Sequence, residues 1–217
     1  MKHIEEFKED ILYELRRFSG NELRRKGHRE NFVIELNRYL DDVSEEYIVQ
    51  TVGAYNFNLI EVVMKKDKTP FPGEFLYIGD GNRDDVDYIK RRITFDQLTK
   101  KAKRKLDYVL ESLIKFYEDR FLEFINKAPA RPLVANQPHT LAEIPLIGKL
   151  RTGGILSKRK MMEIDSFNEI EGASDLNEKY IITLLKKRIK KEMKGNLKRY
   201  YFVFPPKGED KDKYYNW

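Results

Sequence analysis

Eight cationic side chains fall within fourteen residues near the end of this sequence, against one acid, Glu192. Ile182, Leu185, Ile189 and Met193 recur at helical spacing through the same stretch and predict an apolar stripe. Most of the cations then share the opposite face, which suits a phosphate backbone because each neutralised phosphate releases counterions. The alternative is a solvated helix face. The residues predicted to bind nucleic acid are Lys187, Lys190, Lys191, Lys194, Lys198 and Arg199.

Two further basic groups lie well apart from the first in the sequence. Three separated clusters favour a polyanionic partner more than one cluster does. The first of the two comprises Arg16, Arg17, Arg24, Arg25, Lys26 and Arg29, and the second Lys100, Lys101, Lys103, Arg104 and Lys105.

Three aromatic residues, Tyr214, Tyr215 and Trp217, stand on a polar tail that follows Pro205-Pro206. Tyrosine and tryptophan dominate interface hot spots, and a solvated indole forfeits a large apolar burial. We therefore expect these three residues to bind a protein partner.

Acidic residues offer a weaker case for catalysis. Glu35, Glu61 and Asp80, with Lys65 nearby, would have to converge to hold a divalent ion and a water nucleophile, as in a metal-dependent nuclease. The sequence lacks a lysine two positions after Glu61 and a Pro-Asp dipeptide before it. We accordingly predict no catalytic residue and no metal site, and keep the nuclease as the enzymatic alternative.

Composition narrows the remaining classes of chemistry. The chain has no cysteine, which excludes disulfides, thiolate zinc sites and cysteine nucleophiles. It has no phosphate-cradling or dinucleotide-binding glycine motif, so no cofactor is expected. No apolar run reaches the roughly 18 residues of a membrane span, and the start of the chain lacks a signal-peptide core. A cytoplasmic or virion location without membrane association is expected.

The helices and strands expected from the sequence position these residues, and together they predict an α+β, mostly helical fold. We expect a helical hairpin from residues 3–18 and 31–43, and a small antiparallel sheet from 47–52, 57–64 and 74–78. Thr94 and Gln97 form a capping box that predicts one long helix to about residue 126.

The C-terminal half is predicted to hold an extended Pro/Gly arm, a short helix over 157–168, the basic helix and a strand over 200–204. The predicted domains are 1–127 for the core, 128–157 for the arm or linker, and 158–217 for the basic helix, strand and docking tail.

The parts together predict a non-enzymatic assembly subunit of a larger complex that contains nucleic acid. In plan the chain is similar to phage head-to-tail connector and adaptor proteins, in which a helical core carries a docking tail. That resemblance implies other protein subunits as partners, in a homo-oligomer or ring. The alternatives are a DNA- or RNA-binding regulator and the metal-dependent nuclease.

Overall fold

The computed structural model describes residues 2–23, 29–128, 141, 144, 147, 149–174, 176–195 and 197–204. Its contacts divide the chain into two compact units. Unit 1 contains the described residues of Met1–Leu113 and Ile189–Asn216, and unit 2 contains those of Ile114–Arg188.

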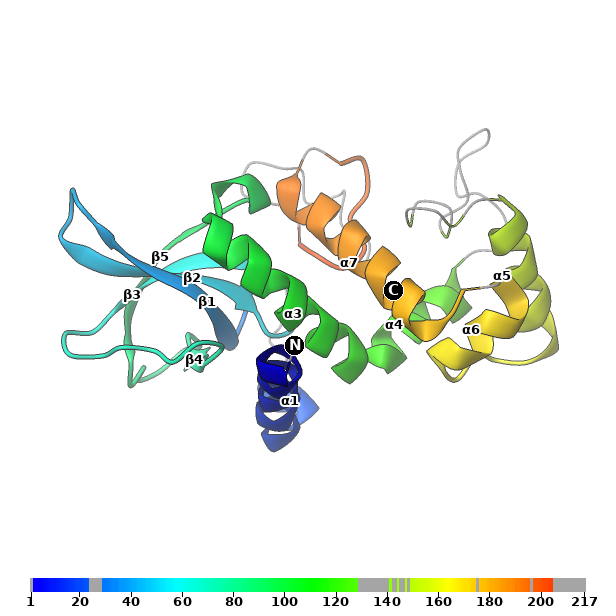
Figure 1. The fold of residues 1–217 in the computed structure, drawn as a ribbon, viewed down its shortest axis with the longest axis horizontal. Coiled ribbons are helices and arrows are strands. Elements are labelled where there is room, and N and C mark those ends of the chain that lie inside the picture. The colour runs from blue at the N-terminus through cyan, green and yellow to red at the C-terminus, as the bar shows by residue number, and fades with distance from the viewer. Residues whose placement is uncertain are drawn as a thin grey trace. The chain divides into compact units, whose positions relative to one another are not determined.

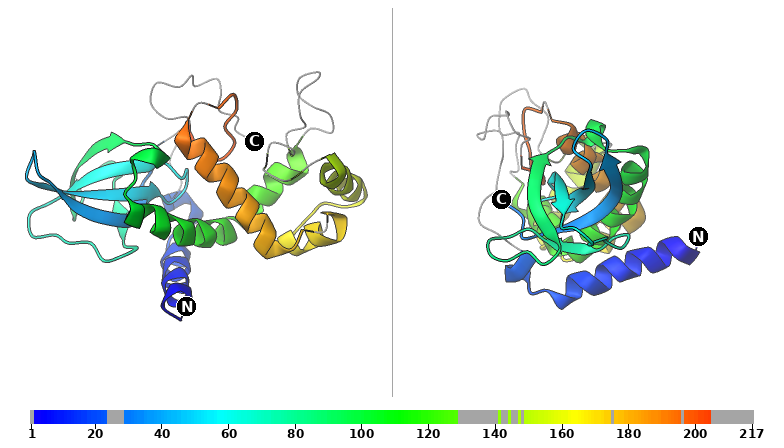
Figure 2. Two further views of the ribbon diagram at one scale, coloured as in Figure 1. Left: turned by 45° about the horizontal axis from the view of Figure 1, so that its top comes forward. Right: turned by 90° about the vertical axis from the view of Figure 1, so that its left-hand side faces the viewer.

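A five-stranded antiparallel sheet in the order β4-β1-β2-β3-β5 forms the centre of unit 1. The sheet curls into a half-barrel (Figure 2). The middle strands β2 and β3 are largely buried on both faces, and β3 has no exposed residue. The strands are β1 (Phe32–Asp41), β2 (Glu46–Gly53), β3 (Leu59–Met64), β4 (Phe75–Tyr77) and β5 (Val86–Arg92). An apolar cluster fills the half-barrel: Val33, Val49, Ile60, Val62, Met64, Leu76, Ile78 and Val86.

Unit 1 also contains helices that pack beside this sheet (Figure 1). The helix α1 (Lys2–Arg17) is joined to α3 (Lys100–Phe116) by the Lys8 backbone carbonyl, which accepts from Ser112 Oγ at 3.1 Å. A short α2 (Gly20–Leu23) and a 3-10 turn η1 (Phe95–Gln97) precede the sheet and α3 respectively. The helix α7 (Glu178–Lys194) contributes its last turns to unit 1.

Unit 2 is helical in its described part. It contains α4 (Glu118–Lys127), α5 (Lys149–Met161) and α6 (Phe167–Ser174), besides the end of α3 and most of α7. The Asn126 side chain fastens α4 to the α5–α6 connection, because it donates to the Ile164 carbonyl at 2.9 Å and accepts from the Ile164 N–H at 3.2 Å. The unit's core is built from isoleucines and leucines, among them Ile125, Ile144, Ile155, Ile170, Leu184 and Leu185.

The prediction of a mostly helical fold is wrong, because the core of unit 1 is the sheet. The helix expected over 31–43 is strand β1. A bulge between Glu35 and Asn37 shifts the register of β1 against β2, and this irregularity interrupts the two-residue alternation. In the sequence, Phe32, Leu36 and Leu40 recur at four-residue steps, which fit the period of a helix as well as the two-residue period of a strand.

Three predictions about the second half of the chain also need correction. The single long helix is three elements: its capping box closes η1, where Gln97 Oε1 accepts from the Thr94 N–H at 2.8 Å, and α3 and α4 are separate around Tyr117. Residues 149–157 of the expected arm are helical. Residues 200–204 form no strand, because three of their backbone N–H groups donate to one carboxylate.

Candidate nucleic-acid interface

The structure divides the six predicted cations of the C-terminal region into surface and interior groups. Lys187, Lys191 and Lys194 are exposed on α7, at four- and three-residue spacing that places them on one helix face. Lys198, beyond the end of α7, is exposed too. Arg199 exposes only 6% of its surface, so it belongs to the interior rather than to a binding surface.

The acid among these cations, Glu192, is fully buried. Its Oε2 accepts from the backbone N–H groups of Tyr201, Phe202 and Val203 at 3.1, 2.9 and 2.8 Å. Gly195, at φ +85°, ends α7 and lets the following chain return toward this carboxylate. The exposed side of the last turns of α7 therefore carries lysines, while the Glu192 carboxylate lies in the interior.

The basic stretches of α3 and α7 meet in unit 1. Lys190 of α7 forms an ion pair with Asp107 of α3, which explains why Lys190 is only partly exposed. One helical turn away, Lys103 Nζ and Lys194 Nζ lie 5.3 and 5.4 Å from the centroid of the Phe95 ring. The Phe95 ring thus makes a cation–π contact with one lysine from each helix.

We name this surface the α3–α7 basic face. It consists of Phe95, Lys103, Lys191, Lys194 and Lys198.

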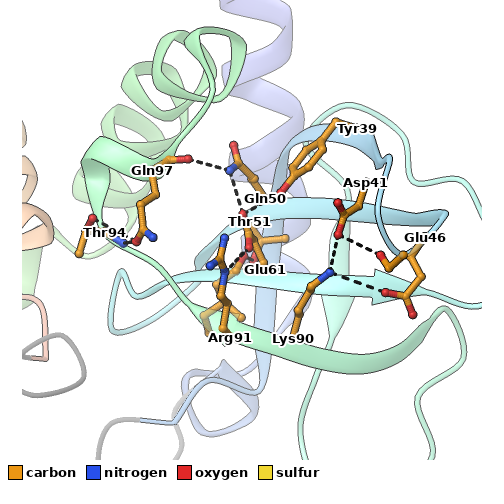
Figure 3. A network of polar contacts seen from close by, with 12 residues as sticks. Tyr39, Asp41, Glu46, Gln50, Thr51, Glu61, Lys90, Arg91, Thr94 and Gln97 are labelled. Atoms are coloured by element: carbon orange, nitrogen blue, oxygen red, sulfur yellow. Dashed lines mark hydrogen bonds and ion pairs between the residues drawn. The ribbon is translucent and has the colours of Figure 1, made fainter.

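A buried polar network on the sheet fixes the start of α3 (Figure 3). Gln50 of β2 donates to the Gln97 carbonyl at 3.1 Å and accepts from the Thr99 N–H at 2.9 Å. Thr99 Oγ1 in turn accepts from the Ala102 N–H at 3.1 Å and so caps α3. The sheet thereby sets the position from which Lys103 projects.

Glu61 anchors that network from the middle of the sheet. Its carboxylate accepts from Arg91 Nε at 2.7 Å, Tyr39 Oη at 3.0 Å and Gln50 Nε2 at 3.1 Å. Burial works to raise the pKa of Glu61, but these three hydrogen bonds and the Arg91 charge outweigh it and lower the pKa. Burial and the bond to Glu61 raise the pKa of Tyr39 to about 12.

Two of the three carboxylates considered for a nuclease, Glu35 and Glu61, have separate partners. Glu35, which lies on a strand rather than a helix, pairs with Lys105 and accepts from the Gly73 N–H at 2.9 Å. Glu61 pairs with Arg91, and Lys65 donates to the Arg83 carbonyl. Among the described residues, no three His, Cys, Asp or Glu side chains are grouped so that they could hold a metal ion.

The predicted partner-binding residues Tyr214, Tyr215 and Trp217 lie outside the described residues. Two residues that shape the basic face were not predicted, namely Phe95 and Asp107. Phe95 did have a signal in the sequence, since it directly follows the capping residue Thr94 and is followed by the basic run of α3. In the part of the chain that the structure describes, no helix is long and apolar enough to cross a membrane.

Comparison with known proteins identifies relatives that are archaeal. An uncharacterized protein of Methanocaldococcus jannaschii is 36% identical over 163 residues, which are 75% of this chain and 72% of that protein. The crystal structure of Af1531 from Archaeoglobus fulgidus superimposes with a TM-score of 0.68 at 31% identity, and the match covers 79% of this chain and 97% of that one. The model of a family described as a protein of unknown function, DUF655, matches residues 37–205. The chain belongs to the DUF655 family.

Proposed function

We propose that this protein binds nucleic acid through the α3–α7 basic face. The observation that carries the proposal is the Phe95 ring, which holds Lys103 and Lys194 from two different helices within 5.4 Å of its centroid. Two ammonium groups gathered at one partly exposed ring repel each other, and a bound phosphate relieves that repulsion.

The arrangement of acids supports the same function. Between Lys186 and Arg199 the sequence has one carboxylate, and burial of Glu192 removes it from the surface. Lys191, Lys194 and Lys198 consequently face solvent without an acid from their own segment. Lys191 and Lys194 are neighbours on one helix face, so their charges act together at physiological ionic strength, which favours a polyanion over a single small anion.

Phosphate contacts supply affinity without reading sequence. The members of the α3–α7 basic face are one aromatic ring and four lysines, and each lysine ammonium is a point charge on a flexible stem that can contact a phosphate of any sequence. We therefore infer a binder of low sequence specificity. The assembly-subunit hypothesis depends on the aromatic tail and stays a prediction.

The test is a four-residue variant in which Lys103, Lys191, Lys194 and Lys198 become Gln. Fluorescence anisotropy with labelled oligonucleotides over a series of salt concentrations should show weaker binding. It should also show a shallower dependence of log K on log salt, by about 0.7 to 0.9 for each lost phosphate contact.

The matched control replaces four exposed lysines elsewhere by Gln, namely Lys66, Lys115, Lys127 and Lys160. It changes the net charge by the same amount, so it should shift the affinity slightly through the overall field and leave the salt slope near that of the wild type. Equal slopes for the two variants would contradict the proposal.

A further inference from the structure

A groove between α1 and α3 lies on the other side of the first turns of α3. Its volume is about 490 Å³. Ile4 and Phe7 of α1 and Pro72 of the β3–β4 connection line its apolar side, while Lys101, Arg104 and Tyr108 of α3 line the other.

The aromatic residues of the groove are held in place by their surroundings. Gly73 packs so closely on Phe7 that a Cβ atom at Gly73 would lie 2.6 Å from Phe7 Cε2. Lys8 Nζ lies 5.9 Å from the centroid of the Tyr108 ring and is itself held by Glu111 at 2.9 Å. Both rings are only partly buried, so each keeps surface for a ligand.

The cations that line the groove differ in whether they already have a partner within the protein. Lys105 is committed to the buried Glu35. Lys101 and Arg104 are exposed, and within the described residues neither takes part in a hydrogen bond or an ion pair. Two such cations beside two aromatic rings are the combination that binds phosphates and stacked bases.

The groove and the α3–α7 basic face lie on different sides of one helix, α3. Lys101 and Arg104, three residues apart, are neighbours on the groove side, whereas Lys103 belongs to the basic face. A ligand that contacts both surfaces must therefore bend around a helix about 10–12 Å in diameter. A duplex, with a persistence length of about 50 nm, is too stiff for that path, whereas a single strand with splayed bases follows it.

We propose that the ligand is single-stranded nucleic acid, with a base in the α1–α3 groove against Tyr108 and Phe7 and its phosphates on Lys101 and Arg104. The inference rests on the proposed nucleic-acid-binding function and specifies its substrate class.

The experiment compares one labelled oligonucleotide of mixed sequence as a single strand and as a duplex, by fluorescence anisotropy with the full chain. The wild type should bind the single strand at least tenfold more tightly. Tyr108→Leu should weaken single-strand binding about tenfold, as expected for loss of one stacked base, and leave duplex binding unchanged. Tyr108→Phe, which keeps the ring, should bind like the wild type.

Three outcomes would overturn the inference. If the wild type binds single strand and duplex equally tightly, the ligand is not specifically single-stranded, although the protein still binds nucleic acid. If a folded Tyr108→Leu variant binds the single strand as tightly as the wild type does, the α1–α3 groove does not bind a base. Full competition by millimolar mononucleotide would make the groove a small-molecule site. Absence of any binding by the wild type would instead remove the proposed function itself.

Discussion

Lys190 of α7 forms an ion pair with Asp107 of α3, although the two residues are 83 positions apart in the sequence. This contact joins two helices that both carry an excess of lysine. It also uses one positive charge internally and places one carboxylate at the edge of the α3–α7 basic face. Asp107 therefore opposes the field that the surrounding lysines produce.

Asp107→Asn should tighten nucleic-acid binding. The substitution removes the carboxylate and releases Lys190, so the local positive charge rises and the salt dependence of binding steepens. The pair is partly exposed, with 22% and 43% of the two side chains accessible, so the free energy of unfolding should fall by no more than about 1 kcal/mol. Anisotropy titrations and urea unfolding measure the two effects. Weaker binding by a stable variant would show that Asp107 helps rather than opposes the ligand.

Glu192→Ala should destabilise unit 1 strongly. The change leaves the buried N–H groups of Tyr201, Phe202 and Val203 without their shared acceptor, and one unsatisfied buried group costs about 1–3 kcal/mol. We expect a loss of about 3 kcal/mol or more in urea unfolding. Lys191→Ala is the matched control, because Lys191 is the exposed neighbour and its truncation should cost less than about 0.5 kcal/mol.

Elements with a clear period could be predicted from the sequence. The helix expected over 3–18 is α1, and the basic amphipathic helix is α7. The strand expected over 47–52 lies inside β2, because its β-branched residues lack a competing helical period. In contrast, β1 was predicted as a helix because Phe32, Leu36 and Leu40 recur at four-residue steps, which fit a helix as well as a strand. Strand β5 was missed because its sequence, VDYIKRR, is mostly exposed at the sheet edge.

The candidate site was predictable only as a set of charges. Sequence places Glu192 among the lysines at α7, but its burial depends on the return of residues 201–203 to the helix. The ion pair of Lys190 with Asp107 and the approach of Lys103 to Phe95 depend on tertiary packing of α3. Such contacts leave no periodic signal in a single sequence.

Stability should depend on the pH through Glu30, which is 2% exposed. Burial raises the pKa of its carboxyl from 4.5 to about 7, against hydrogen bonds from Asn56, Asn58 and Tyr55 that lower it. The folded state then binds a proton more tightly than the unfolded state. The contribution of Glu30 is therefore fully present below about pH 4.5 and is lost as the pH rises toward 7.

Glu30→Gln should flatten that part of the profile. Chemical unfolding at several pH values from 4.5 to 8 should show a decline in the wild type, at most about 3 kcal/mol from this group, that the variant lacks. Glu22, an exposed carboxylate whose pKa is lowered, provides the control substitution Glu22→Gln. The decline should persist in that control. A steeper decline in Glu30→Gln would show that the group is ionised and stabilising in the folded protein.

Phe95→Leu should separate the role of the ring from that of the lysines. Leucine keeps the apolar contact of η1 but has no π face, so Lys103 and Lys194 lose the attraction that holds them together, worth about 0.5–1 kcal/mol for each exposed pair. Both charges remain, and the salt slope should therefore match the wild type, whereas the affinity falls severalfold because the ammonium groups are less ordered before binding.

Phe95→Tyr keeps an aromatic face and should bind like the wild type. Anisotropy at three salt concentrations distinguishes the variants: a changed slope in Phe95→Leu would mean that a phosphate contact was lost, and wild-type affinity would mean that the ring does not organise the face.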